Sequence, residues 1–390
     1  MKIVMTGGGS GGHITPILAV AHEIKQYHND VQITYIGQAG DRFGSMVAEQ
    51  PIIDEVQTVQ AGKFRRYHGQ GIAQLLDVHT IGLNLRDAFK ALIGIWQAWR
   101  ILGKIKPDVV FCKGGFVGVP VGLAAALRKI PYVTHDSDAI PGLANRIIAK
   151  WATKHAVALD AALYPYPRDK TVTVGVPVAD TYQQVGAKHQ AAYKRLVGLE
   201  QYELVLLVTG GGLGAQRLND ALLHISGELL RMFPGLCIVH TAGQKHEVDV
   251  SEAYSKNLEA ELRKRVIVRD FLPNLYAYSG AADVVIARGG ATNLAELALQ
   301  AKPCIIVPNP LLTGGHQLKN ATAYVKNNAI IVVEELDLQK PETLLAQTAT
   351  LLQDPTRRKV LSQNLAQFAR PDATKALATI LWKAGGKTHA

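Results

Sequence analysis

Short apolar runs alternate along this chain with longer amphipathic segments, and the alternation continues almost to the end. Apolar runs of roughly four to eight residues bounded by Gly or Pro are typical of strands buried in a parallel sheet. Because strands and helices alternate, the pattern predicts an α/β fold with doubly wound parallel sheets. The predicted strands span residues 2–6, 31–36, 53–59, 108–112, 131–134, 203–208, 266–269, 283–287 and 304–307.

The opening pattern of strand, Gly-rich loop and helix occurs twice. The first loop is Gly7–Gly12, and Gly210–Gly214 repeats its position in the second half. A chain of 390 residues exceeds the usual size of a single core, so we predict two Rossmann-like domains, residues 1–177 and 178–370. The stretch 181–200 is predicted to be helical, and the last helix, within 371–390, is expected to pack back on the first domain.

Two Gly-rich turns follow neighbouring predicted strands in the second half. One contains Arg288, and the other leads into His316 and Gln317. Ligands of open parallel sheets bind outside the carboxyl ends of the strands, where helix N-termini favour phosphate. Glu296 lies one turn inside the first of these helices, where its carboxylate suits a neutral diol such as ribose. This combination favours a nucleotide site over the alternative of ordinary turns with a solvated Glu296.

The first loop formally satisfies the dinucleotide pattern G-x-G-x-x-G. That pattern also requires an acid at the end of the second strand, and the nearest acid is Asp41, so NAD is disfavoured. What remains is a loop able to hold a diphosphate. His13 stands at the start of the following helix, where the helix dipole keeps an imidazole neutral and able to accept a proton. The alternative for His13 is a simple helix-entry residue.

Composition limits the possible partners. Lys and Arg outnumber Asp and Glu by 42 to 32, a net charge of +10 that suggests an anionic partner. The basic residues are scattered, so we predict no nucleic acid. Cys112, Cys237 and Cys304 lie far apart in or beside apolar runs, so we expect them to be buried and reduced, as in a cytoplasmic protein.

An amphipathic segment in the first half has apolar residues at three- and four-residue spacing: Ile81, Leu85, Phe89, Leu92, Trp96 and Trp99. Basic residues accompany it, at Arg86, Lys90, Arg100 and Lys104, and a basic cluster precedes it, at Lys63, Arg65 and Arg66. Such a helix usually packs on a sheet, but it also suits a membrane surface. No stretch reaches the roughly 18 apolar residues of a membrane span, so the protein is expected to be soluble or peripheral.

Asp136-Ser137-Asp138 is formally a D-x-D motif, which one class of sugar transferases uses to hold Mn²⁺ under a nucleotide diphosphate. Three residues are a weak match within a doubly wound pattern rich in Gly loops. We therefore predict no metal site and no cofactor.

Seven motifs spread over nearly the whole chain carry a family resemblance: GGGSGGH with Thr15-Pro16, GKFRRY, KPDVVFCKGGFVGVP, HDSDAIPGLANRI, GGGLGAQRLN, RGGATNLAEL and GGHQLKNA. Together they resemble the MurG family, the N-acetylglucosaminyl transferases that make the second lipid-linked precursor of the bacterial cell wall. The resemblance implies the GT-B glycosyltransferase architecture, with a cleft between two Rossmann-like domains.

The resemblance also implies the reaction and the partners. N-acetylglucosamine would pass with inversion from UDP-GlcNAc to the C4 hydroxyl of undecaprenyl-diphosphoryl-MurNAc-pentapeptide. The protein would lie at the cytoplasmic face of the cell membrane, on an anionic membrane surface, and would meet other cell-wall synthesis or division proteins.

Site residues follow from the same resemblance. Glu296 would contact the uridine ribose, and Gln317, with His316 beside it, would contact the N-acetylglucosamine. His13 is the candidate base, and Asp138 is the second catalytic candidate. The other donor residues implied are Gly211, Gly212, Gly214, Arg288, Ala291 and Thr292. The acceptor residues implied are Ser10, Gly11, Gly12, Thr15, Gly114, Gly115 and Asn145.

Two positions depart from the family pattern. Many relatives have Ser in place of Gly212 and Arg in place of Ala179, and both would help to hold the donor diphosphate. Arg217 and Arg288 are the candidates to replace them. Three alternatives stay open: a UDP-GlcNAc 2-epimerase, a GT-B transferase with another lipid-linked acceptor, and a non-catalytic nucleotide-sugar-binding scaffold.

Overall fold

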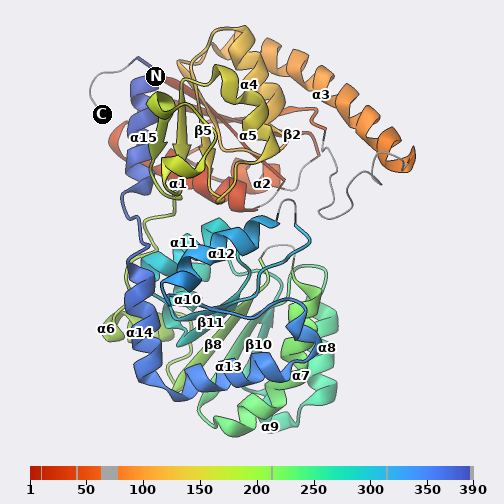
Figure 1. Ribbon diagram of the computed structural model, residues 1–390, viewed down its shortest axis with the longest axis vertical. Helices are drawn as coiled ribbons and strands as arrows, with labels where there is room; N and C mark the ends of the chain where they lie inside the picture. Colours follow the sequence, from red (N-terminus) through yellow and green to blue (C-terminus); the bar gives the residue numbers. More distant parts are fainter. Residues whose placement is uncertain (10, 41–42, 63–77, 212–213, 313–314, 387–390) are drawn as a thin grey trace. The chain divides into compact units, whose positions relative to one another are not determined.

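The computed structural model describes residues 1–390 except 10, 41–42, 63–77, 212–213, 313–314 and 387–390 (Figure 1). The chain divides into two compact units. Unit 1 comprises Met1–Asp180, Leu311–His316 and Arg370–Ala390, and unit 2 comprises Thr181–Pro310 and Gln317–Ala369. Each unit has its own parallel sheet with helices on both faces, so the predicted α/β fold with two doubly wound domains is confirmed.

Unit 1 contains a seven-stranded sheet in the order β3-β2-β1-β4-β5-β6-β7, with parallel neighbours. Its strands are β1 Lys2–Thr6, β2 Gln32–Gln38, β3 Glu55–Val59, β4 Val109–Cys112, β5 Tyr132–Asp136, β6 Lys154–Val157 and β7 Thr171–Thr173. Its helices are α1 Gly11–Tyr27, α2 Phe43–Ala48, α3 Val78–Ile105, α4 Gly118–Leu127, α5 Leu143–Ile148 and α15 Ala373–Ala384.

Alternate residues of the strands in unit 1 form two separate cores, because successive side chains of a strand point to opposite faces. Ile3 and Met5 of β1 join the core under α1, α2 and α15. Val4, between them, joins the core under α3 and α4. The C-terminal helix α15 thereby packs on the same face of the sheet as α1.

Unit 2 contains a six-stranded parallel sheet in the order β10-β9-β8-β11-β12-β13. Its strands are β8 Leu204–Thr209, β9 Leu236–Thr241, β10 Val266–Arg269, β11 Val284–Ala287, β12 Cys304–Ile306 and β13 Ile331–Val332. Its helices are α6 Ala187–Leu196, α7 Gln216–Met232, α8 Glu247–Asn257, α9 Ala260–Arg263, α10 Leu275–Ala281, α11 Ala291–Gln300, α12 His316–Lys326, α13 Glu342–Gln353 and α14 Pro355–Ala366.

Both sheets reverse their strand order at one point. In unit 1 the first strand, β1, lies between β2 and β4, and in unit 2 the corresponding strand, β8, lies between β9 and β11. Ligands of open α/β sheets bind at this topological switch point. The loops that follow β1, β4, β8 and β11 are Gly-rich and carry most of the predicted site, and the Gly-rich turn that leads into His316 and Gln317 follows β12.

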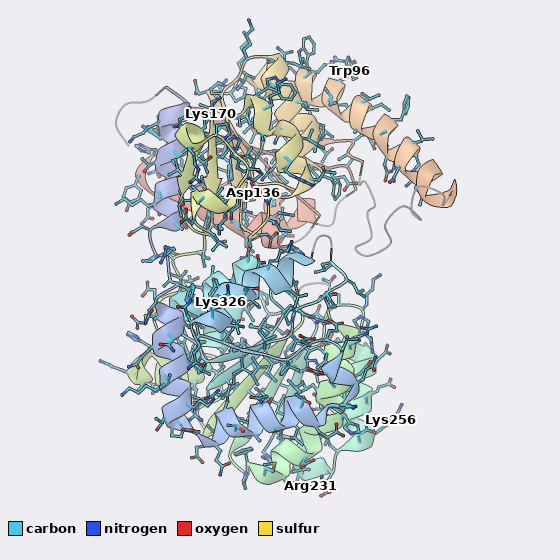
Figure 2. All side chains as sticks on the ribbon, viewed as in Figure 1. Trp96, Asp136, Lys170, Arg231, Lys256 and Lys326 are labelled. Atoms are coloured by element: carbon cyan, nitrogen blue, oxygen red, sulfur yellow. The ribbon has the colours of Figure 1, made fainter. Side chains whose placement is uncertain are left out.

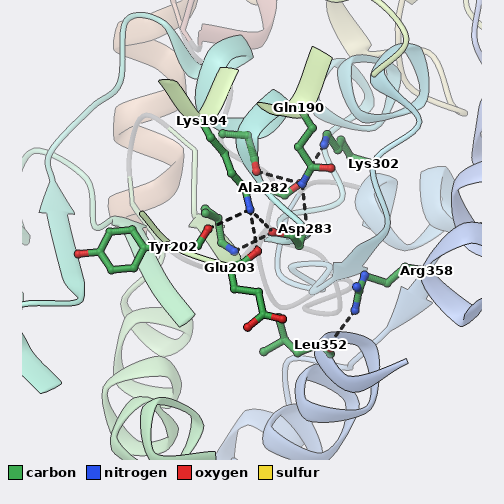
Figure 3. Close-up of polar contacts among 11 residues, drawn as sticks. Gln190, Lys194, Tyr202, Glu203, Ala282, Asp283, Lys302, Leu352 and Arg358 are labelled. Carbon is green, nitrogen blue, oxygen red and sulfur yellow. Dashed lines mark hydrogen bonds and ion pairs between the residues drawn. The ribbon is translucent and has the colours of Figure 1, made fainter. Parts of the chain in front are cut away.

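The predicted helix over 181–200 is too long at both ends, since α6 covers only Ala187–Leu196. Residues before it are held in a different way, because the backbone N–H of Val185 donates to the carbonyl of Gln300 at 3.2 Å. Asp283, just before β11, anchors α6 itself (Figure 3). Its carboxylate accepts from Gln190 at 2.9 Å and pairs with Lys194 at 3.2 Å.

Strand β5 continues two residues beyond its predicted end, to Asp136. The reason is the neighbouring strand, because β5 pairs with β6 as far as Asp136 opposite Val157. Asp136 therefore belongs to the sheet rather than to the following loop. The expectation that Cys112, Cys237 and Cys304 are buried and free is confirmed.

Candidate functional site

Two glycine loops pack closely against each other at the switch point of unit 1. Gly115, after β4, has φ +77°, and a Cβ there would lie 2.4 Å from the carbonyl oxygen of Gly8. Gly9, after β1, has φ +86°, and a Cβ there would lie 2.8 Å from the ring of Phe116. Only glycine fits such close approaches at positive φ. The structure thus brings the predicted loops Gly7–Gly12 and Gly114–Gly115 together.

His13 lies in the first turn of α1, beside these two glycine loops. Its Nδ1 is 2.9 Å from the carbonyl oxygen of Gly8. A carbonyl can only accept, so Nδ1 carries the proton, and in the neutral ring the lone pair is on Nε2. Burial, then the positive charge of Lys113, lowers the pKa of His13 to about 4. At neutral pH the ring is therefore a base with its lone pair on a defined atom.

Lys113 was not predicted as a site residue. It follows β4, its side chain is buried, and its ammonium donates to the Ser137 hydroxyl at 2.9 Å. Burial lowers the pKa of Lys113 to about 8, while Asp138 and Asp136 oppose that change. A lysine directly after an apolar strand and before Gly114-Gly115 was the available signal in the sequence. This buried cation lowers the pKa of His13.

Asp136 and Asp138 occupy different surroundings. The Asp136 carboxylate is buried and accepts from the Tyr166 hydroxyl at 2.7 Å and from the Gly142 backbone N–H at 3.2 Å. Burial raises its pKa. Asp138 is half-buried, and its carbonyl accepts from the Tyr164 hydroxyl at 2.9 Å. Asp136 is therefore part of the framework of unit 1, whereas Asp138 is the more accessible carboxylate of the pair.

Asn145, on α5, is buried beside the loop after β4. Its side-chain amide donates to the carbonyl of His135 at 2.9 Å, and it is the nearest neighbour of a Cβ placed on Gly114, at 3.5 Å. The remaining predicted acceptor residues form the start of α1. Gly11 and Gly12 are in its first turn, and the Thr15 hydroxyl donates to the Gly11 carbonyl at 3.3 Å. Ser10 lies outside the described residues.

In unit 2 three predicted donor residues, Gly211, Gly212 and Gly214, follow β8 in the sequence. Gly212 lies outside the described residues. Gly211 is exposed with φ +79°. Gly214 has φ +76°, and a Cβ there would lie 2.5 Å from the carbonyl oxygen of Ala242. This glycine allows the loop to pass close to the backbone after β9.

Arg288, directly after β11, is largely buried. Its guanidinium forms an ion pair with the buried carboxylate of Glu335 and donates to the carbonyl of Val307 at 3.1 Å. Arg217, which is half-exposed at the start of α7, approaches the same Glu335 carboxylate at 3.8 Å. Glu335 was not foreseen from the sequence. Both arginines face Glu335, but Arg217 is half-exposed and Arg288 is buried, so Arg217 is the more accessible of the two candidate diphosphate ligands.

Helices α11 and α12 bring the other predicted donor residues close to one another. Ala291 and Thr292 are the first two residues of α11, and His316 and Gln317 are the first two of α12. The buried Gln317 side-chain carbonyl accepts from the Asn309 backbone N–H at 2.8 Å. A Cβ on Gly289 would lie 2.9 Å from the Gln317 carbonyl oxygen, so the turn after β11 packs directly on α12.

Glu296 lines a small pocket within unit 2. Burial raises the pKa of its carboxyl to about 8, and a hydrogen bond from the Tyr182 hydroxyl opposes that increase. Nothing in the sequence indicated that Tyr182 would reach Glu296. The full lining consists of Tyr182, Leu207, Thr209, Leu275, Ser279, Val285, Asn293, Glu296 and Leu297.

Across the described ranges, no group of three or more His, Cys, Asp or Glu is placed to hold a metal ion. The prediction that the protein works without a metal therefore stays a prediction. Within those same ranges, no helix is both long and apolar enough to cross a bilayer.

The outer face of α3 is apolar and exposed. Its residues are Leu85, Phe89, Leu92, Trp96 and Trp99, with exposed fractions of 68%, 66%, 64%, 57% and 43%. Figure 2 shows Trp96 on this helix. Arg100 stacks over Trp96 at 4.9 Å, and Arg128 stacks over Trp99 at 3.9 Å. The earlier basic cluster, Lys63, Arg65 and Arg66, falls outside the described residues.

Two family models match the chain. The glycosyltransferase family 28 N-terminal domain matches residues 3–157, and the glycosyltransferase family 28 C-terminal domain matches residues 205–377. Both halves of the chain therefore resemble the same kind of glycosyltransferase.

Curated relatives match over nearly their full length. A Bacillus cereus protein named UDP-N-acetylglucosamine--N-acetylmuramyl-(pentapeptide) pyrophosphoryl-undecaprenol N-acetylglucosamine transferase 1 is 31% identical, over 98% of this chain and 99% of the relative. A Limosilactobacillus reuteri protein named as the same transferase is 30% identical, over 98% of each.

Solved structures share the fold. The crystal structure of Acinetobacter baumannii MurG superposes with a TM-score of 0.69 at 24% identity, over 98% of this chain and 99% of that one. A UDP-GlcNAc 2-epimerase from Neisseria meningitidis, bound to UDP-GlcNAc, gives a TM-score of 0.61 at 14% identity, over 98% of this chain and 100% of the epimerase. The fold is thus common to transferases and epimerases, and it does not separate them.

Proposed function

Because this chain belongs to the N-acetylmuramyl-(pentapeptide) pyrophosphoryl-undecaprenol N-acetylglucosamine transferases of glycosyltransferase family 28, we propose the reaction that this family name describes. N-acetylglucosamine passes from UDP-GlcNAc to the C4 hydroxyl of undecaprenyl-diphosphoryl-MurNAc-pentapeptide. The observation that carries the proposal is the match to curated transferases over 98% of this chain. The two family models span the loops of both switch points, whereas the epimerase likeness is one of fold alone.

His13 is the proposed base. The acceptor oxygen forms a bond to C1 of the sugar while the bond from C1 to the UDP oxygen breaks, so the α-linked donor gives a β-linked product. The proton of the attacking hydroxyl passes to Nε2 of His13, whose lone pair is defined by the Nδ1 contact with Gly8. General base catalysis of this kind contributes roughly 10²–10⁴-fold to rate.

The leaving diphosphate needs electrostatic stabilisation. Backbone N–H groups at the start of α11 and in the loop after β8 favour anions, since the first N–H groups of a helix have no partner within that helix. Arg217 adds a half-exposed guanidinium at the start of α7. We propose that these groups hold the diphosphate and that no metal ion is required.

The exposed face of α3 is proposed to lie on the anionic cytoplasmic surface of the cell membrane. Its Leu, Phe and Trp side chains are typical of a helix that lies in the membrane interface, and the net charge of +10 attracts anionic lipid. Basic residues near such a surface contribute about 1 kcal/mol each. Flotation with anionic liposomes at low salt tests this. Phe89→Glu with Trp96→Glu should abolish flotation, and Val248→Glu, at a similarly exposed apolar residue of α8, should preserve it.

The reaction is tested by incubating the protein with radiolabelled UDP-GlcNAc and a short-chain analogue of the lipid-linked acceptor, followed by extraction of the lipid product. Label in the lipid fraction is expected. Release of a UDP-sugar epimerised at C2, with no label transferred, would favour the epimerase instead. Binding of UDP-GlcNAc with neither reaction would favour a non-catalytic protein.

A further inference from the structure

The pocket next to Glu296 is closed on one side by the segment that begins unit 2. Tyr182 lies two residues beyond Asp180, the last residue of the first segment of unit 1, and is half-buried. Its hydroxyl donates a hydrogen bond to the Glu296 carboxylate. A residue far away in sequence thus contacts the one carboxylate of the pocket lining.

An aromatic cluster holds Tyr182 in place. Its ring meets the ring of Tyr276, on α10, edge-on at 6.2 Å. Tyr276 in turn meets Tyr193, on α6, edge-on at 6.2 Å. Aromatic pairs favour such edge-to-face geometry. Helix α6 is itself anchored through Asp283, so the position of the Tyr182 hydroxyl is set by packing inside unit 2.

Glu296 can bind a ribose well only when it is ionised. A carboxylate has two oxygens and about four lone-pair sites, so it can accept from Tyr182 and still accept from a diol. A protonated carboxyl loses part of that capacity, and burial favours the protonated form. Burial together with the nearby Glu296 also raises the pKa of Tyr182, so this hydroxyl keeps its proton and stays a donor.

We propose that Tyr182 is a positioning residue of the donor site, whose hydroxyl orients the Glu296 carboxylate so that the nucleoside of the donor can bind. This inference rests on the proposed function, because it takes Glu296 as the ribose ligand. It adds a residue from the connecting segment to a site otherwise built from α11 and α12.

Other groups near Glu296 are neutral or engaged elsewhere. The neighbouring elements face the pocket with Thr209 from β8, Ser279 from α10 and Asn293 from α11. Helix α14 also packs on α11, and its basic residues are Arg357, Arg358 and Lys359. Two of these are exposed, and Arg358 donates to the carbonyls of Leu351 and Leu352. Within the described part of the chain, Tyr182 is the partner that opposes the burial-driven rise of the Glu296 pKa.

Calorimetric titration of UDP into the full chain at a series of pH values tests the proposal. Tyr182→Phe keeps the ring and removes only the hydroxyl. The hydrogen bond opposes the burial-driven rise of the Glu296 pKa, so its loss should raise that pKa further and lower the ionised fraction. At pH 7 the Kd of UDP should therefore rise about tenfold, the effect expected from losing one hydrogen bond to a charged group. The variant and the wild type should converge only when the pH rises well above the wild-type Glu296 value of about 8 and above the higher value of the variant.

Two further variants make the outcome specific. Tyr276→Phe removes a hydroxyl from the same aromatic cluster without touching Glu296, and it should bind UDP like the wild type. Glu296→Gln cannot ionise, so its UDP affinity should be weak and should lack the pH dependence of the wild type. A wild-type profile in Glu296→Gln would overturn the assignment of Glu296 to the donor, and with it this part of the proposed function.

The inference alone fails in two cases. A ratio of Kd values between Tyr182→Phe and wild type that stays constant with pH would mean that Tyr182 is only a wall of the pocket. Tighter UDP binding by Tyr182→Phe would mean that the tyrosine blocks the ribose position. In both cases UDP would still bind the wild type, so the proposed function would stand. Absence of UDP binding to the wild type at every pH would overturn both.

Discussion

The two switch points have the same strand order and different chemistry. In unit 1 the closely packed glycine loops surround His13 and Lys113, two ionisable side chains whose pKa values burial lowers. In unit 2 the comparable loops lie near Glu296 and the Arg288–Glu335 ion pair. A neutral imidazole can accept a proton, whereas a carboxylate can accept hydrogen bonds from a ribose and the helix N-termini beside it favour a diphosphate. The comparison teaches that one topology can support catalysis in one unit and nucleotide binding in the other.

The difference arises from side chains that the loops position rather than from the loops themselves. Gly115 in unit 1 and Gly214 in unit 2 both adopt positive φ and both allow a close backbone approach. The two loops therefore meet the same backbone requirement, which only glycine satisfies. What distinguishes the units is the residue that each loop places beside that backbone.

The largest effect is expected from His13→Ala. The variant should lower kcat by roughly 10²–10⁴-fold, because a general base contributes about that much. Steady-state kinetics with both substrates measures it. His22→Ala, at an exposed histidine of the same helix, is the matched control and should leave kcat unchanged. A loss of less than tenfold in His13→Ala would assign the base elsewhere.

Glu296→Ala should act on the donor alone. Hydrogen bonds to a charged group contribute ~1.5–3 kcal/mol each, and ~1.4 kcal/mol is one decade in affinity. The KM for UDP-GlcNAc should therefore rise at least about tenfold when it is measured above the Glu296 pKa of about 8. The KM for the lipid acceptor should barely change. Glu261→Ala, at an exposed carboxylate of α9, is the control.

Lys113→Met should change the pH profile. After burial, Lys113 is the main cause of the low pKa of His13, which is about 4. The base must be neutral, so activity is lost as the pH falls through that pKa. Removing the lysine charge should raise the pKa of His13 and move the acid limb of kcat/KM to higher pH. Lys150→Met, at an exposed lysine, should leave the limb in place. An acid limb that stays fixed in Lys113→Met would exclude this coupling.

Treatment with EDTA should leave turnover unchanged, which is the smallest of the expected effects. The proposed stabilisation of the leaving diphosphate uses helix N-termini and Arg217 rather than a metal. Turnover before and after chelation measures it. Complete loss that Mn²⁺ alone restores would make Asp136 and Asp138 metal ligands and would contradict the account.

Every predicted strand range overlaps a strand of the structure, because a buried strand produces a local run of apolar residues, but no range was predicted for β6, β7, β9 or β13. The run at 266–269, for example, is β10 to the residue. Boundaries that depend on a partner were missed, since β5 extends to Asp136 by pairing with β6. The predicted helix over 181–200 failed for a similar reason, because a contact with Gln300 holds Val185.

The site, like the fold, has features that local sequence predicts and features that depend on distant contacts. The glycine loops could be located from the sequence, since positive φ and close approach require glycine at particular positions. Contacts between distant residues could not. Glu335 lies 47 residues from Arg288, and the Tyr182 hydroxyl reaches Glu296 from the start of unit 2. Periodicity and motifs carry no information on such pairs, and only the packing of the unit shows them.

The central claim is that unit 2 binds the donor and unit 1 supplies the base. Calorimetric titration of UDP into the wild type, His13→Ala and Glu296→Ala tests it most directly. The account predicts that His13→Ala binds UDP as the wild type does and that Glu296→Ala binds it at least about tenfold more weakly. Loss of UDP binding in His13→Ala, or wild-type binding in Glu296→Ala, would contradict this division of roles.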